Sequence, residues 1–259
     1  GSGPGGYVAA IRAAQYGLKV AVVEKEQKLG GTCLHVGCVP TKALLHYAEL
    51  YEEALRSEKW GLSYQNLHLD YTQLIRRKSA IVGKHAKGVE YLFKKHKIET
   101  IRGRGTLLGK GQVEVSAAEV SPAEVSGAEV SSTGRGRTLS APNIILATGS
   151  SALMLPGLTA DRDRILTNVE ILDLTEIPKS LVIIGGGAVG VEFASVFRSF
   201  GAQVTIVEML PRLVPSEDED VSAELARAFR KRGIEVHLGA KVGRVSRSAG
   251  GLEISLTDS

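Results

Sequence analysis

The two cysteines of the chain, Cys33 and Cys38, are the side chains whose spacing most directly suggests chemistry, because only four residues separate them. Thiols this close in sequence can form a disulfide without a large movement of the backbone. We expect a helix from Thr41 to about Leu55 with Pro40 at its start, and the N-terminus of a helix stabilises a nearby thiolate. The spacing therefore predicts a redox-active dithiol.

Two other interpretations of these cysteines have to be weighed. A free cysteine is most often a small, buried apolar side chain that does no chemistry. A zinc site would need further cysteine or histidine ligands at a suitable spacing, and none cluster around this stretch. The glycine-rich entry at Gly30–Gly31 and the predicted helix start favour the reactive dithiol, and we predict no metal site.

A glycine-rich stretch, Gly1–Gly6, fits the pattern G-x-G-x-x-G and leads into a helical pattern that Gly17 closes. The apolar run Val20–Val23 follows and ends at Glu24. In a dinucleotide-binding unit such glycines let a pyrophosphate approach the helix N-terminus, and the acid binds a ribose hydroxyl. The strand that should lead into Gly1 is missing from the sequence, so we expect the chain to be a fragment.

A second such stretch, Gly185–Gly190, lies between the apolar run Leu181–Ile184 and a predicted helix, Val191–Phe200. The strand predicted after this helix, Val204–Val207, ends at Glu208. The last glycine and the acid are equally far apart in both units. Glycine turns that merely permit helix packing are the alternative, but the order of strand, turn, helix, strand and acid favours dinucleotide binding. Because a carboxylate accepts from a 2′-hydroxyl and repels a 2′-phosphate, we expect NAD rather than NADP.

Between the two units the pattern predicts a long helix from Leu74 to Lys95, a short strand at Ile98–Ile101 and a small meander of strands. The helix is expected to place the following side chains in the core: Ile75, Ile81, Val82, Val89, Tyr91, Leu92 and Phe93. A five-residue repeat spans residues 115–131, and its period matches neither strand nor helix. We therefore expect a surface loop there.

The remaining segments are predicted from shorter patterns. Ile144–Ala147 has the pattern of a buried strand that ends in a small-residue turn, and Pro156–Gly157 marks a boundary. A further helix (about Glu219–Arg232) and strand (Glu235–Leu238) follow the second fingerprint, and the last residues resemble an opening hairpin.

These patterns together predict an α/β fold with two Rossmann-like dinucleotide-binding domains, the first with a small β-meander. We place the first domain at residues 1–150 and the second at 151–259, incomplete at its C-terminal end.

Composition narrows the class of protein. With 259 residues, 43% hydrophobic and 23% charged, the chain resembles a soluble globular protein. Its net charge is only +4, and its basic runs fall in or beside amphipathic helical patterns, which argues against a nucleic-acid partner. No apolar run is long enough for a membrane span. Two cysteines are too few for a secreted disulfide framework, so we expect a reducing compartment, the cytoplasm.

Four stretches in this order and spacing resemble the flavoprotein disulfide reductases, class I of the pyridine nucleotide-disulfide oxidoreductases. They are Gly1–Gly6, Gly30–Lys42, Ala147–Ser150 and Gly185–Glu192 with Glu208. The resemblance is strongest to the members that oxidise dihydrolipoamide, and it covers nearly the whole chain apart from the repeat.

The resemblance implies that the first domain binds FAD. Gly1, Gly3 and Gly6 would contact the pyrophosphate and Glu24 the adenosine ribose. Further FAD contacts are implied for Gly31, Thr32, Cys33, Lys42, Gly105, Thr148, Gly149 and Ser150. The resemblance also implies that Cys38 lies beside the flavin as the charge-transfer thiolate, whereas Cys33 is the interchange thiol that meets the substrate.

For the second domain the resemblance implies NAD binding through Gly185, Gly187, Gly190, Glu192, Glu208 and Val242. Lys42 is implied to lie near the flavin and to pair with Glu192, which would flank the nicotinamide; a cation there would stabilise the Cys38 thiolate. Without the resemblance, Lys42 is a solvated helix lysine and Glu192 an ordinary acid near a helix N-terminus.

The implied reaction is the oxidation of dihydrolipoamide to lipoamide through the Cys33–Cys38 disulfide and FAD, with NAD as hydride acceptor. The family's base is a histidine of the partner subunit in a homodimer, carried by a C-terminal domain that is absent here. None of the six histidines matches it, including His35. We therefore expect the chain alone to be inactive, and its partners to be lipoyl-bearing domains of 2-oxo-acid dehydrogenase complexes or of glycine cleavage.

Three alternatives stay open. Mercuric and glutathione reductases share the cysteine motif, although they use NADP, which Glu208 disfavours. A non-catalytic nucleotide-binding relative would place no demand on Cys33, Cys38 or Lys42. A scaffold protein that acts through the five-residue repeat has only that repeat in its favour.

Overall fold

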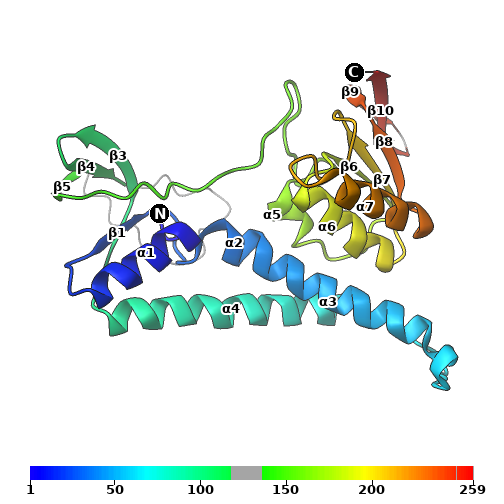
Figure 1. Ribbon diagram of the computed structural model, residues 1–259, viewed down its shortest axis with the longest axis horizontal. Coiled ribbons are helices and arrows are strands. Elements are labelled where there is room, and N and C mark those ends of the chain that lie inside the picture. Colours follow the sequence, from blue (N-terminus) through cyan, green and yellow to red (C-terminus); the bar gives the residue numbers. More distant parts are fainter. Residues whose placement is uncertain (118–135, 249, 259) are drawn as a thin grey trace. The chain divides into compact units, whose positions relative to one another are not determined.

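The computed structural model of the chain describes residues 1–117, 136–248 and 250–258. Contacts divide the chain into two compact units, each built from two segments. The first unit comprises Gly1–Cys38 and Val82–Ser151, and the second comprises Val39–Ile81 and Ala152–Ser259. Two long helices, α3 (Cys38–Leu55) and α4 (Tyr71–Lys95), contribute residues to both units (Figure 1).

The first unit is built on a parallel pair of strands. Helix α1 (Pro4–Gln15) leads to β1 (Ala21–Glu24), which pairs with β2 (Glu99–Arg102), and α2 (Gly31–Val36) follows β1. Apolar side chains from these elements, from the loops next to them and from the second half of α4 form one buried cluster: Ala10, Val22, Leu29, Leu34, Ala86, Val89, Phe93 and Ile98. This core holds the loop after β1, and with it α2, in place.

A three-stranded antiparallel meander completes the first unit. Its strands are β3 (Arg104–Gly109), β4 (Gln112–Ser116) and β5 (Arg137–Ser140), in that order. The predicted meander is therefore confirmed. The first copy of the five-residue repeat ends β4, and the later copies lie largely outside the described residues, so the expected surface loop stays a prediction.

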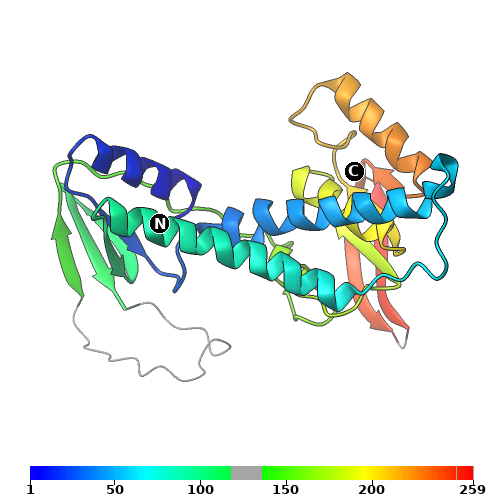
Figure 2. The same cartoon turned by 90° about the horizontal axis from the view of Figure 1, so that it is seen from below.

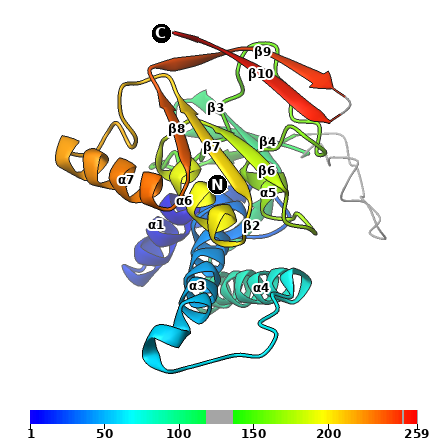
Figure 3. The ribbon, with the colours of Figure 1, turned by 90° about the vertical axis from the view of Figure 1, so that its right-hand side faces the viewer.

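The second unit contains a parallel sheet in the order β6 (Ser180–Ile184), β7 (Gln203–Glu208) and β8 (Glu235–Leu238). Helices α6 (Ala188–Ser199) and α7 (Glu219–Lys231) connect these strands (Figure 3). Large side chains that are fully buried in this core include Val196, Phe197, Ile206, Leu213 and Ile234. All these helices and strands were predicted from the sequence, and they are confirmed to within a few residues.

The second unit also has shorter elements outside this sheet. It contains a 3-10 turn (Ser57–Trp60), the short helix α5 (Asn168–Ile171) and a hairpin of β9 (Ala240–Ser248) and β10 (Gly251–Asp258). The predicted hairpin is thus confirmed.

Two side chains of the first half of α4 form hydrogen bonds to other parts of the second unit. Arg77 donates to the hydroxyl oxygen of Tyr47 on α3 at 3.1 Å, where the two helices run side by side (Figure 2). The buried Lys78 donates to the carbonyl oxygen of Leu172 at 2.5 Å and to the carboxylate of Asp173 at 2.9 Å.

The predicted start of α3 was wrong. The helix begins at Cys38 rather than Thr41, and Cys33 lies in the separate helix α2, which the sequence pattern did not indicate. Pro40 does not mark the first residue, because the first four amides of a helix have no partner within it and a proline is tolerated anywhere there. Similarly, α4 begins at Tyr71 rather than Leu74.

The predicted strand at Ile144–Ala147 was also wrong. Within the described residues this segment pairs with no strand, and the side chains of Ile145 and Leu146 are 69% and 66% exposed. An apolar run forms a buried strand only where another strand supplies hydrogen-bond partners. Tyr91, predicted to be in the core, is exposed because it lies on the outer face of α4.

Candidate functional site

The first glycine fingerprint makes a tight turn into α1. Gly3 is the N-cap of this helix and Pro4 its first residue, and no side chain caps the helix. A Cβ on Gly6 would overlap the carbonyl oxygen of Gly1, and a Cβ on Gly1 would lie 2.5 Å from the carbonyl oxygen of Ala147. Only glycine fits at these two positions, because the backbone segments touch there.

Glu24, the acid at the end of β1, is fastened to this turn. Its carboxylate accepts from the amide of Ser2 at 2.7 Å, from the Ser2 hydroxyl at 2.6 Å and from the amide of Glu26 at 2.9 Å. Burial would raise the pKa of Glu24, but these hydrogen bonds outweigh it and hold the pKa below its usual value. The carboxylate is therefore ionised at neutral pH.

The second fingerprint repeats this arrangement. Glu208 accepts from the amide of Gly186 at 2.6 Å and from the amide of Leu210 at 2.8 Å, and it is also buried. A Cβ on Gly190 would overlap the carbonyl oxygen of Gly185, as at the first turn. Each acid thus binds the amide of the second fingerprint residue and the amide two residues beyond itself.

Both turns fit a dinucleotide. Gly187 is the N-cap of α6, no side chain caps that helix, and a Cβ at Gly187 would meet open space. The N-terminus of α6 presents amides and a positive dipole end to that space, which suits a pyrophosphate, and α1 likewise begins at a glycine N-cap without a capping side chain. The sequence-predicted glycines and acids therefore come together in two separate turns, one in each unit, which we call the first and second cradle.

The predicted disulfide between Cys33 and Cys38 is confirmed, with a Cα–Cα distance of 4.7 Å. It links α2 to the first residue of α3 across Gly37. A Cβ on Gly37 would lie 3.0 Å from the carbonyl oxygen of Thr32 and 3.1 Å from the Cα of Cys33, so a small residue is needed for the two helices to close. The ring nitrogen Nε2 of His35 lies 2.8 Å from the carbonyl oxygen of Leu29, which fixes the turn.

The disulfide helix α2 packs directly on the first fingerprint. Gly30 and Gly31 adopt positive φ values of 126° and 65°, and a Cβ on Gly31 would lie 2.5 Å from the Cα of Gly3. The amide of Gly30 also donates to the carbonyl oxygen of Ser2 at 3.1 Å and to its hydroxyl at 3.2 Å. The helix that carries Cys33 is therefore packed against and hydrogen-bonded to the first cradle.

Some of the other residues predicted for this cradle lie near the start of α2, whereas Gly105 lies in a strand of the meander. Thr32 donates to the carbonyl oxygen of Ser150 at 3.5 Å, which brings the loop of Thr148 and Gly149 to the start of α2. Gly105 lies in β3, where a Cβ would come within 3.3 Å of Val23 on β1, so strand packing already accounts for this glycine.

In the second unit, Lys42 of α3 forms an ion pair with Glu192 of α6, as predicted. The Lys42 side chain is 60% exposed and that of Glu192 is 28% exposed. Val242 lies on β9 opposite Leu256, and its predicted contact with NAD stays a prediction.

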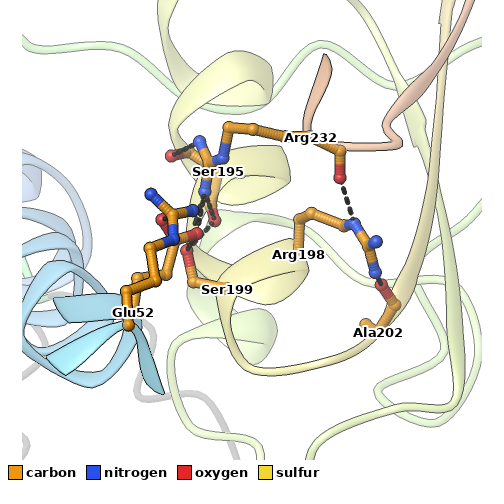
Figure 4. Close-up of polar contacts among 7 residues, drawn as sticks. Glu52, Ser195, Arg198, Ser199, Ala202 and Arg232 are labelled. Atoms are coloured by element: carbon orange, nitrogen blue, oxygen red, sulfur yellow. Dashed lines mark hydrogen bonds and ion pairs between the residues drawn. The ribbon is translucent and has the colours of Figure 1, made fainter. Parts of the chain in front are cut away.

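Two features were missed by sequence reasoning. Ser2 is fully buried and links Glu24 to Gly30, yet it occupies a variable position of the fingerprint, so no pattern pointed to it. A network of Glu52, Ser195, Ser199 and Arg232 joins α3, α6 and the end of α7 (Figure 4). Its members are up to 180 residues apart, and no local signal connects them.

Among the described residues, no group of three or more His, Cys, Asp or Glu side chains could hold a metal ion. No helix in the described part of the chain is long and apolar enough to cross a bilayer.

Comparison with known proteins gives consistent results. A family profile described as pyridine nucleotide-disulphide oxidoreductase matches residues 1–259. The chain is 44% identical over 256 residues to a dihydrolipoyl dehydrogenase of Chlorobaculum tepidum, covering 99% of this chain and 51% of that protein. It is 45% identical over 243 residues to that of Bacillus subtilis, covering 93% and 50%. The chain thus spans about half the length of these curated relatives.

Solved structures show the same relationship. LpdA from Mycobacterium tuberculosis matches with a TM-score of 0.85 and 26% identity, covering 99% of this chain and 54% of that one. The HOCl-induced flavoprotein disulfide reductase RclA from Escherichia coli matches with a TM-score of 0.75 and 26% identity, covering 100% and 53%. The predicted α/β fold with two Rossmann-like units is therefore confirmed.

Proposed function

Because the chain belongs to the pyridine nucleotide-disulphide oxidoreductase family, we propose that it carries the nucleotide and dithiol sites of a dihydrolipoyl dehydrogenase. The disulfide, which is built into the first nucleotide cradle, supports this proposal most strongly. The similarity to curated dihydrolipoyl dehydrogenases points to dihydrolipoamide as the substrate.

We assign residues 1–150 to FAD binding and residues 151–259 to NAD binding. The first cradle would hold the FAD pyrophosphate at Gly1, Gly3 and Gly6, with Glu24 at the ribose. The second would hold NAD at Gly185, Gly187, Gly190, Glu192 and Glu208. The ionised, buried Glu24 and the buried Glu208 supply acceptors for ribose hydroxyls. A carboxylate at Glu208 also disfavours the 2′-phosphate of NADP.

The thiol chemistry follows from the positions of the cysteines. A thiolate of dihydrolipoamide attacks Sγ of Cys33, the S–S bond to Cys38 breaks, and Cys38 leaves as a thiolate. The second substrate thiol then attacks the mixed disulfide, which releases lipoamide and leaves Cys33 reduced. Cys38 suits the role of leaving group because it is the first residue of α3, where amides and the helix dipole stabilise negative charge.

The two electrons gained by the dithiol have to leave it again. The chemistry that FAD supplies when bound is two-electron transfer between this dithiol and a pyridine nucleotide. Lys42, paired with Glu192, would place a cation on this path. None of the described histidines is assigned the role of the base that accepts the substrate protons.

The wider context is proposed from the same family relationship. We infer that the partners are lipoyl-bearing domains of 2-oxo-acid dehydrogenase complexes or of glycine cleavage, that the protein acts as a homodimer, and that it works in the cytoplasm. The small number of cysteines agrees with a reducing compartment.

Replacing Cys38 tests the proposed function. In the protein that carries this chain, Cys38→Ser should retain bound flavin but lower lipoamide turnover at least about a thousandfold, the scale that follows loss of a nucleophile. Flavin content is measured by visible absorption and turnover by NADH formation. The exposed Ser79→Ala should change neither quantity. Turnover that survives in Cys38→Ser would refute the proposed function.

A further inference from the structure

Helices α3 and α6 of the second unit are joined at two places. Near their starts, Lys42 pairs with Glu192. Near their ends, the carboxylate of Glu52 accepts from the hydroxyl of Ser199 at 2.7 Å. The helices therefore run in the same direction, with one contact toward each end.

The second contact is a dense network. Arg232, just after α7, donates to Glu52 at 2.8 Å, to the hydroxyls of Ser195 and Ser199 at 2.7 Å each, and to the carbonyl oxygen of Ser195 at 3.1 Å (Figure 4). Glu52 and Arg232 are only 24% and 26% exposed. We call these four residues, Glu52, Ser195, Ser199 and Arg232, the clamp.

The cavity beside the clamp is lined by cationic side chains, most of which take part in helix packing. It has a volume of about 350 Å³, and its lining includes Arg56, Arg198, Lys231 and Arg232. The ends of α6 and α7 meet there, and carbonyl ends of helices favour cations. Arg198 accordingly donates to the carbonyl oxygens of Arg232 and Ala202, at 2.6 and 3.4 Å. Arg56 and Arg232 pair with Glu52, so these two cations and Arg198 serve the packing of the helices.

The positions of the contact residues along α6 and α3 show how the two contacts are related. Glu192, Ser195 and Ser199 are spaced three and then four residues apart, so they share one face of α6. On α3, Lys42 and Glu52 are ten residues apart, about 2.8 turns, so both side chains can reach the same neighbouring helix. A contact toward each end of the pair prevents α3 from sliding or rotating on α6.

We propose that the clamp is a positioning device that holds Lys42 against Glu192. The inference rests on the proposed function, in which this pair lies on the electron path. An exposed ion pair is too weak to fix two helices by itself. The half-buried clamp, with four hydrogen bonds donated by Arg232, is far better suited to do so.

The test measures how well Lys42 is protected. The purified chain is treated with an amine-acylating reagent, and the rate at Lys42 is followed by mass spectrometry relative to the exposed Lys179. Glu192→Gln breaks the pair directly, and Glu52→Gln breaks the clamp. Both should accelerate acylation of Lys42 by about two- to fivefold, the factor that corresponds to an exposed pair worth up to about 1 kcal/mol.

The matched control is Glu53→Gln, which alters the neighbouring, exposed carboxylate and should leave the rate at Lys42 unchanged. If circular dichroism shows that Glu52→Gln does not fold, Ser199→Ala replaces it with the same expectation. An unchanged rate in Glu52→Gln while Glu192→Gln accelerates acylation would overturn the proposal, as would an unchanged rate in Glu192→Gln. Acylation requires neither flavin nor substrate, so its result is independent of whether lipoamide is turned over.

Discussion

Glu24 and Glu208 occupy equivalent positions in the two nucleotide units, but their partners differ at one side chain. Each carboxylate binds the amide of the second fingerprint residue, which is Ser2 in the first unit and Gly186 in the second. Only Ser2 adds a hydroxyl, which donates to Glu24 and accepts from the amide of Gly30. This hydroxyl thus ties the first acid to the loop that leads to Cys33.

Removing the Ser2 hydroxyl should weaken the first unit. Ser2→Ala keeps the Cβ and the backbone bonds but leaves the amide of Gly30 with one acceptor fewer and Glu24 with one donor fewer. We expect a loss of about 1–3 kcal/mol in the free energy of unfolding, the range for a buried hydrogen-bonded group beside a charge. Urea denaturation measures it, with the exposed Ser79→Ala as the control. Equal stability of the two variants would contradict this role.

At the scale of elements, the contact between α3 and α6 depends on an ionised carboxylate. Burial would raise the pKa of Glu52, but the hydrogen bonds from Ser199 and Arg232 and the charge of Arg232 outweigh it and lower the pKa. Arg56 also lies beside this carboxylate at 3.2 Å. Because the folded pKa lies below the unfolded one, the ionised form stabilises the fold.

The free energy of unfolding should depend on pH through the ionisation of Glu52. Above the unfolded pKa of about 4.3 the contribution of Glu52 is complete, and it is lost as the pH falls through the folded pKa. At neutral pH, the free energy of unfolding of the wild type should therefore exceed that of Glu52→Gln by about 1–2 kcal/mol. The difference should shrink below roughly pH 4. Urea titrations between neutral pH and about pH 3 measure it. A difference that persists or grows in acid would rule out this origin.

The molecule as a whole carries two nucleotide cradles built by the same rules, one in each unit. In both, a glycine of the first helical turn faces the carbonyl of the first fingerprint residue, with no room for a Cβ. The same substitution, alanine for this glycine, should therefore inactivate each cradle without affecting the other. That property distinguishes a protein with two independent nucleotide sites from one with a single site.

Reciprocal alanine substitutions test this separation. Gly6→Ala should weaken FAD retention about tenfold or more while NADH binding is kept, and Gly190→Ala should do the reverse, because an overpacked turn costs roughly 1–3 kcal/mol. Flavin absorbance and NADH titration give the two readouts. Gly83→Ala, where a Cβ meets open space on α4, is the matched control and should bind both. Loss of both cofactors in either variant would contradict separate cradles.

The sequence by itself determined most of the helices and strands and both glycine–acid turns. Apolar periodicity and glycine–acid spacing follow from hydrogen bonding and sterics within about 30 residues, so Gly1–Gly6 with Glu24 and Gly185–Gly190 with Glu208 could be recognised, as could the Cys33–Cys38 pair. Tertiary structure alone decided the rest. The strand predicted at 144–147 failed because strand formation depends on a partner elsewhere in the chain. Ser2 and the clamp stayed hidden because polar side chains far apart in sequence find one another only once helices and strands have packed.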